Sequence, residues 1–440
     1  MPPPGQRLAE VEEAEVHDAA TPTEAPPATG RQRFRHGINH TFSALAVYNF
    51  RILWFGMLFT MAAFQINIVS RSWLAYSISG SGAVLGIVAL ARGIPQFLLA
   101  PYGGVAADRF DKRTLLIVAQ LLMAILSATI AILVQTGLIT IWQLVVIGFF
   151  QGVIFPFLMP TRTAYISELV DDGRLPNALA LDSTGRNLNR VVAPTLAGFL
   201  IALSPAMAFW AVTGFFLLSA AMLLKLPKPT PKPFRSSGTF SDMLFGFRYI
   251  AARPNLVALM GLAFVFVLLG MPYSQLLPVF QQNVFHVGPE KLGFMYTAVG
   301  LGAVVGSLTA AYLAESTKKR TIQIVVGCIF GLMLAGFALS PSYVVGLPFL
   351  LIAGGMIETY FTLNRILVIL NTDRAVFGRV MAIYSMSWSL TPVSLLVMGA
   401  IVDQVGAPLT VATAGIALAI VVVVLALSIP GVRRVGEMGH

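Results

Sequence analysis

Cysteine and charged residues are scarce in this sequence. Lys, Arg, Asp and Glu make up 11% of its 440 residues and hydrophobic residues 57%, whereas a soluble domain carries about 25% charge. So few charges cannot cover a water-exposed surface, which excludes a soluble globular protein and a wholly disordered one. The single cysteine, Cys328, excludes an internal disulfide and a zinc site built from cysteines.

Motifs for nucleotides and for enzymatic chemistry are also lacking. No Gly-x-x-x-x-Gly-Lys-Ser/Thr string occurs, so direct use of ATP has no support. The strings GSGAVLG (80–86) and GLGAVVG (300–306) imitate a dinucleotide fingerprint, but both lie in apolar runs. We interpret their small residues as helix–helix contacts. The sequence therefore predicts neither an enzyme nor a cofactor, metal or nucleotide site.

Long apolar runs are what the sequence does contain. A transmembrane helix needs about 20 mostly apolar residues. Twelve stretches qualify, at 52–72, 83–106, 114–135, 141–161, 180–203, 206–224, 256–280, 292–314, 322–339, 343–363, 376–401 and 409–429. The fifth is the weakest, because Asp182, Arg186 and Arg190 lie in its first part; without it the count is eleven.

Lys and Arg collect in alternate loops between these runs. They occur at 109–113, 174, 225–253, 318–320 and 374, whereas the other loops hold little beyond Lys291, with Arg71 near a boundary. Because basic residues mark cytoplasmic loops, the net charge of +10 indicates membrane topology rather than nucleic-acid binding. The pattern predicts a multi-pass protein of the plasma (inner) membrane with both termini cytoplasmic. That topology requires an even number of spans and favours twelve.

The longest loop divides the predicted spans six and six. Its segment 239–253 has helical apolar spacing, so we expect an amphipathic helix on the inner membrane surface, with a solvated linker helix as the alternative. The expected organisation is given by five ranges: a disordered cytoplasmic tail (1–40), an N-terminal half (41–226), a cytoplasmic linker (227–254), a C-terminal half (255–430) and a second tail (431–440).

The two halves carry an internal repeat. A constant shift of 207 residues pairs Gly86 with Gly293 and Gly148 with Gly355. The pairs run through spans two to four and eight to ten, which agrees with the six-plus-six division. Two parallel halves of this kind place a cavity at their interface, near the middle of the membrane.

The inner loop after span two holds the most specific string, GGVAADRFDKR (103–113). It resembles the signature loop of the major facilitator superfamily, with matches at Gly104, Asp108, Arg109, Lys112 and Arg113. Asp111 stands where that family usually has glycine. The resemblance implies an all-α membrane protein with twelve helices in two pseudo-symmetric six-helix halves. It also implies a gating latch between Asp108 and the start of span eleven, with Arg162 as a second candidate partner.

Two further stretches narrow the resemblance. The string VVAPTLAG (191–198) is similar to the antiporter motif of exporter members, where Pro194 and Gly198 match and Ala193 replaces a glycine. An ordinary proline-kinked helix is the alternative. The strings at 160–181 and 377–388 resemble the enterobactin-exporter and macrolide-efflux branch.

Charges inside the predicted spans are the main functional clue, since a charge at the centre of a transmembrane helix is costly. Glu358 lies in span ten, at the position that the repeat pairs with Gln151 in span four. We expect Glu358 to carry protons, and a static ion pair of Glu358 with Arg92 or another cation is the alternative. For Arg92 of span two, electrostatic pairing and substrate contact both stay open. Asp182, Arg186 and Arg190 share one face of span five, and an interfacial ion pair between Asp182 and Arg186 is an equal alternative.

An apolar, aromatic cavity with a few polar groups is expected between the halves. Its candidate lining residues are Phe64, Gln65, Asn67, Tyr273, Gln275, Tyr360 and Trp388. For any one of them, packing in the helix bundle is the alternative.

Together these features predict a secondary active transporter that works by alternating access. We expect proton-coupled efflux, by antiport, of hydrophobic or amphipathic small molecules of the drug or siderophore type, as in multidrug resistance. The expected partners are the substrate, protons and the lipid bilayer, and the protein is expected to be a monomer. Uptake or flipping of another solute, such as a nutrient or lysolipid, is one alternative. A non-transporting membrane receptor on the same fold is another.

Overall fold

The computed structural model describes residues 43–228 and 240–428, which are helical and contain no strand. The predicted tails at 1–40 and 431–440, and the proline-rich start of the linker, lie outside the described residues.

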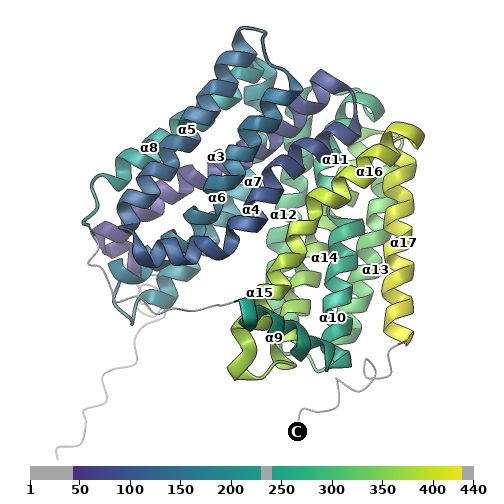
Figure 1. Cartoon of the computed structure of the whole chain (residues 1–440). Helices are drawn as coiled ribbons and strands as arrows, with labels where there is room; N and C mark the ends of the chain where they lie inside the picture. The colour runs from purple at the N-terminus through teal and green to yellow at the C-terminus, as the bar shows by residue number, and fades with distance from the viewer. Residues whose placement is uncertain (1–42, 229–239, 429–440) are drawn as a thin grey trace, which may run out of the picture.

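Two helix bundles make up the described chain (Figure 1). The N-terminal bundle follows the short 3-10 turn η1 (Ser43–Ala46). It consists of α3 (Tyr48–Ser79), α4 (Gly82–Arg109), α5 (Lys112–Gln135), α6 (Ile141–Leu169), α7 (Leu175–Leu203) and α8 (Pro205–Leu223). Between the bundles, α9 (Phe240–Ala251) occupies part of the range in which a linker helix was expected.

The C-terminal bundle is less regular. Its first span runs through α10 (Pro254–Val265), the π-helical turn η2 (Phe266–Gly270), α11 (Tyr273–Val279) and the π-helical turn η3 (Phe280–Val284). Then follow α12 (Pro289–Leu313), α13 (Lys319–Ala338) and α14 (Tyr343–Leu370). After the turn η4 (Arg374–Val376), α15 (Phe377–Met386), η5 (Ser387–Leu390) and α16 (Thr391–Val405) form one span, and α17 (Ala407–Ser428) is the last.

The predicted fold class is confirmed, and the uncertain fifth span forms a long helix, α7. Eleven described segments are long and apolar enough to cross a membrane. The twelfth, α7, is 29 residues long and packs between α3 and α12, but it carries Asp182, Arg186 and Arg190. Its charges, not its length, set it apart from its neighbours.

The two bundles meet along two helix pairs, α4 with α16 and α7 with α12. We call the end that carries α9 the linker end and the opposite end the far end. At the far end the helix backbones touch, because a Cβ on Gly82 would lie 2.8 Å from the carbonyl oxygen of Gly399 and one on Gly198 would lie 2.9 Å from the Cα of Gly293. Small residues allow this close approach. Towards the linker end the bundles diverge (Figure 1).

Polar contacts reinforce closure of the far end. The Asp403 carboxylate of α16 accepts hydrogen bonds from Ser81 Oγ (2.6 Å), the Gly82 amide (2.6 Å) and the Ala83 amide (3.1 Å), at the amino end of α4. A helix amino terminus favours a negative charge. Asn283 Nδ2 donates to the hydroxyl of Tyr76 at 2.6 Å, and these residues are 207 positions apart. Residues equivalent in the internal repeat therefore meet across the interface.

Candidate functional site

Within residues 43–228 and 240–428, seven charged residues lie more than six positions from either end of their helix. They are Arg71, Arg92, Arg162, Asp182, Arg186, Arg190 and Glu358. Charges at this depth are costly in a membrane, so their partners indicate where the chain can do chemistry.

Asp182 joins two arginines within the N-terminal bundle. Its side chain is 5% exposed and accepts hydrogen bonds from Arg162 of α6 and from Arg186, one turn further along α7. The expected pairing with Arg186 is present, but it is buried rather than interfacial. Arg162, expected as a second partner of Asp108, is bound to Asp182. The side chain of Asp108 and the surroundings of Gly104 are not described, so the latch and its partners stay predictions.

Glu358 pairs with Arg190 across the two halves. Arg190 Nη1 donates to Glu358 Oε2 at 3.0 Å, and the side chains are 49% and 32% exposed. The cation that pairs with Glu358 in this conformation is therefore Arg190 and not Arg92. A Cβ on Gly300 of α12 would lie 2.4 Å from the Arg190 carbonyl oxygen. Because α12 also packs on α14, this close approach of α7 brings Arg190 to Glu358.

Gln151 binds an arginine that the sequence placed at a membrane boundary. Arg71 lies inside α3 with 5% exposure. Its Nη1 donates to Gln151 Oε1 at 2.9 Å and its Nη2 to the Leu144 carbonyl at 2.7 Å. Gly148 makes room, since a Cβ there would lie 1.7 Å from Arg71 Nη2. Gln151 and Glu358, which are equivalent in the internal repeat, thus each accept a hydrogen bond from an arginine.

Arg92 has an aromatic partner. Its guanidinium carbon lies 5.2 Å from the centre of the Phe155 ring, and the Phe155 ring packs edge-on against Phe64 at 5.0 Å. The Arg92 Nε is buried without a hydrogen-bond partner among the described residues. Arg92 is therefore held by a cation–π contact and not by a described carboxylate.

The candidate lining residues fall into two groups. Tyr273 is 2% exposed and Tyr360 is fully buried, with its ring stacked on Phe266 at 3.7 Å between centroids. Both pack in the core of the C-terminal bundle in this conformation, which agrees with the bundle-packing alternative for these two residues. Three others keep some exposure or an unused polar atom: Gln65 and Gln275 are half-buried, and Asn67 Nδ2 is buried without a described partner. Trp388 is 37% exposed and packs on Phe361.

The loop after α4 is fixed within the N-terminal bundle. Asp111, with φ of −58°, caps α5 by accepting from the Thr114 amide at 2.6 Å, so no glycine is needed there. Lys112 forms an ion pair with Glu168 of α6 at 2.9 Å. Arg113 donates to the carbonyls of Leu223 (3.0 Å) and Leu224 (2.5 Å) at the end of α8. Arg109 ends α4 and is exposed.

Pro194 and Gly198 lie where α7 contacts α12. Pro194 has no amide proton for the carbonyl of Arg190, which leaves that helical hydrogen bond unmade. The hydroxyl of Thr297 on α12 donates to the Val191 carbonyl at 3.0 Å and is also hydrogen-bonded to Thr195. The part of α7 around Pro194 is therefore an interface between the halves.

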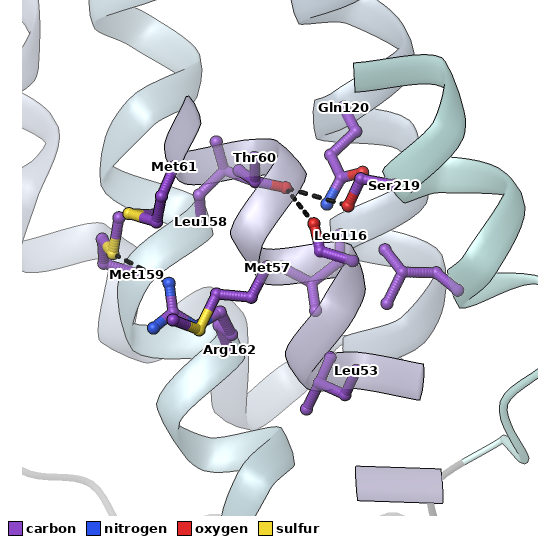
Figure 2. Close-up of a pocket in the computed structure, with 12 residues that line it drawn as sticks. Leu53, Met57, Thr60, Met61, Leu116, Gln120, Leu158, Met159, Arg162 and Ser219 are labelled. Carbon is purple, nitrogen blue, oxygen red and sulfur yellow. Dashed lines mark hydrogen bonds between the residues drawn. The ribbon is translucent and has the colours of Figure 1, made fainter. Parts of the chain in front are cut away.

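A small cavity lies inside the N-terminal bundle, between α3, α5, α6 and α8 (Figure 2). Its volume is about 20 Å³, and its polar edge includes Thr60 and Ser219, whose hydroxyls are 2.9 Å apart, together with Gln120 and Arg162. A cavity of this size holds about one water molecule. It is too small for an amphipathic substrate. The candidate site is instead placed at the interface between the halves, because the deep ion pair between Arg190 and Glu358 joins them there.

Two bundles of transmembrane helices with a charged interface define a membrane transporter of the major facilitator fold. Residues 39–435 match the family model described as transmembrane secretion effector. The chain belongs to this family, and the predicted major facilitator resemblance is confirmed.

Curated relatives and solved structures agree with this assignment. The chain is 25% identical to the enterobactin exporter EntS of Shigella flexneri over 306 residues, which cover 68% of this chain and 72% of that one. It is 26% identical to EntS of Escherichia coli O127:H6 over 341 residues, covering 75% and 77%. The expected likeness to the enterobactin-exporter branch is thus confirmed.

The solved structures show the fold alone, because identity is low. The nucleoside transporter NupG superposes with a TM-score of 0.69 at 15% identity, covering 88% of this chain and 99% of that one. A bacterial homologue of the human lysosomal transporter Spinster, in an inward-facing and occupied conformation, superposes with a TM-score of 0.69 at 13% identity, covering 88% and 97%.

Proposed function

We propose that this chain is a secondary active exporter of hydrophobic or amphipathic small molecules, working by alternating access and driven by inward proton flow. The names of the enterobactin exporters support the direction of transport. We place the protein in the plasma (inner) membrane with the linker end in the cytoplasm, as the distribution of Lys and Arg favours.

The observation that carries the proposal is the ion pair between Arg190 and Glu358. It joins α7 of one half to α14 of the other, and both side chains are partly exposed. Protonation of Glu358 removes its charge and therefore its attraction to Arg190. A proton can in this way change the contact between the halves, which is what coupling requires.

The close packing of the far end supports alternating access. Asp403 and the glycine contacts hold α4 against α16 at that end, while the bundles diverge towards the linker end (Figure 1). A change from this conformation, closed at the far end, to one that is open at the far end would carry a substrate across the membrane. In that exchange the Arg190–Glu358 pair would be remade or replaced.

The test is transport in proteoliposomes, with an amphipathic fluorescent dye and an imposed proton gradient. We expect dye to move from the linker side to the far side, against the proton flow, and a protonophore to abolish its accumulation. Glu358→Gln should move dye at a rate that no longer depends on the gradient. Asp373→Asn removes a carboxylate from a pair with Arg253 on the C-terminal side of the linker and should keep the dependence.

Two results would contradict the proposal. Dye accumulation that survives collapse of the proton gradient would exclude proton coupling, and movement only towards the linker side would exclude export. Cysteines introduced at Thr136 or Ser167 in a Cys328→Ser chain, reacted with an impermeant reagent, fix which end faces outward. Thr136 lies at the far end and Ser167 near the linker end, and both are exposed.

A further inference from the structure

The charges deep in the described helices do not balance. Among the seven charges deep in the helices, five are arginines and two are carboxylates. Asp182 is shared by Arg162 and Arg186, and Glu358 is bound by Arg190. No ion pair with a described carboxylate is left for Arg71 or Arg92. An uncompensated cation at this depth is unfavourable unless something else supplies the negative charge.

Both of these arginines pack on consecutive turns of α6. Arg71 lies against Gly148 and is bonded to Gln151, whereas a Cβ on Gly152 would lie 2.1 Å from the Arg92 carbonyl oxygen. Arg71 is buried and two of its nitrogens have acceptors. Arg92 is partly exposed, and the contact described for its guanidinium is with the ring of Phe155. Of the two cations, Arg92 is the more exposed.

Hydrogen-bond donors without an acceptor occur on α3 and α4, the helices that carry these two arginines. Arg92 Nε, Arg71 Nε and Asn67 Nδ2 are buried and have no hydrogen-bond acceptor among the described residues. Asn67 and Arg71 lie one turn apart on α3. A group that satisfies such a set must accept hydrogen bonds, and a negatively charged acceptor satisfies the cation as well.

The contact with Phe155 suits an anion that carries an apolar body. A guanidinium over an aromatic ring keeps the N–H groups at its edge free for a carboxylate-like fork. The Phe155 ring is partly exposed and meets the buried ring of Phe64 edge to face at 5.0 Å, so Phe155 presents an apolar surface beside that charge. Arg92 and Phe155 together can therefore bind one molecule, Arg92 through its charged head and Phe155 through its aromatic or aliphatic tail.

We infer that Arg92 is the docking point for a negatively charged group of the transported molecule, and that this chain carries amphipathic anions. The inference rests on the proposed transport function and adds to it the charge of the substrate. Glu358 is left to respond to protons, while Arg92, on α4 of the other half, holds the substrate anion.

Binding of a matched pair of probes tests this separately from transport. The probes are 11-(dansylamino)undecanoate and its neutral primary amide, titrated against the full chain in nanodiscs of zwitterionic lipid, with empty nanodiscs as the blank. We expect the anion to bind at least tenfold more tightly than the amide. Arg92→Gln should lose about 10- to 100-fold of the affinity for the anion, as loss of a charge-assisted hydrogen bond does, with little change for the amide. Arg92→Lys should recover part of it.

The controls separate the possible failures. Arg365→Gln removes an exposed arginine near the linker end of α14 and should bind both probes like the unmodified chain. The anion should raise the melting temperature of the unmodified chain but not of Arg92→Gln, which also shows that the variant is folded. Repeating the titration with phosphatidylglycerol in the nanodiscs shows whether an anionic lipid competes for the same place.

The inference is overturned if the amide binds as tightly as the carboxylate, or if Arg92→Gln affects both probes equally. It is also overturned if phosphatidylglycerol alone abolishes binding of the anion, since a lipid headgroup would then be the occupant. If the anion binds through Arg92 but is not moved in proteoliposomes, the inferred site stands and the proposed export fails. If only neutral dyes are exported, export stands and the anion site fails.

Discussion

At the scale of single residues, each deep charge is stabilised in a different way. Asp182 is bound by two arginines, Arg71 by a side-chain amide and a backbone carbonyl, and Arg92 by an aromatic ring. Glycine supplies space where the guanidinium of Arg71 lies against α6. These arrangements cannot be deduced from residue types alone, because they depend on which turns of neighbouring helices face one another.

Removal of the Asp182 charge tests the first of these arrangements. Asp182→Asn should destabilise the chain by about 3–5 kcal/mol, because both Arg162 and Arg186 lose their charged partner. The change is measured as the free energy of unfolding in mixed micelles. Asp373→Asn, the matched control, breaks an exposed pair and should change stability little. Equal changes in the free energy of unfolding would show that the buried cluster around Asp182 stabilises the chain no more than the exposed pair does.

At the scale of helices, close backbone contacts set the conformation. A Cβ on Gly86 of α4 would lie 2.2 Å from the Cα of Leu396 on α16, so no larger residue fits while the far end is closed. The strings 80–86 and 300–306 were interpreted as helix contacts, and Gly86, Gly300 and Gly306 all lie against neighbouring backbones. Small-residue spacing thus predicted the packing, whereas it could not say which helix would be the partner.

Gly86→Val should force α4 and α16 apart at the far end. Spin labels on cysteines at Thr136 and Leu339, in a Cys328→Ser chain, report the distance between the halves there. We expect this distance to lengthen or broaden in Gly86→Val. Gly214→Val is the control, because a Cβ at Gly214 of α8 meets nothing within 4 Å. An unchanged far-end distance in Gly86→Val would contradict the role given to this contact.

At the scale of the whole molecule, much of the fold could be predicted from the sequence. Apolar runs gave the spans, and α7 was uncertain for a physical reason, namely that its charges lower its hydropathy. The 207-residue repeat anticipated equivalent halves, and Tyr76 and Asn283 meet in that register. The ion-pair partner of Glu358 could not be predicted from the sequence, because it depends on the contact of α7 with Gly300 of α12.

The central claim is that a proton on Glu358 changes how the two halves meet. Spin labels at Ser167 of α6 and Thr321 of α13, in the Cys328→Ser chain, report the separation of the halves at the linker end. The most direct measurement follows this separation from neutral to acidic pH, with and without Glu358→Gln. We predict that the unmodified chain shifts on acidification, and that Glu358→Gln shows the acidic distribution already at neutral pH and does not respond further. A pH response of the same size in both chains would contradict the claim.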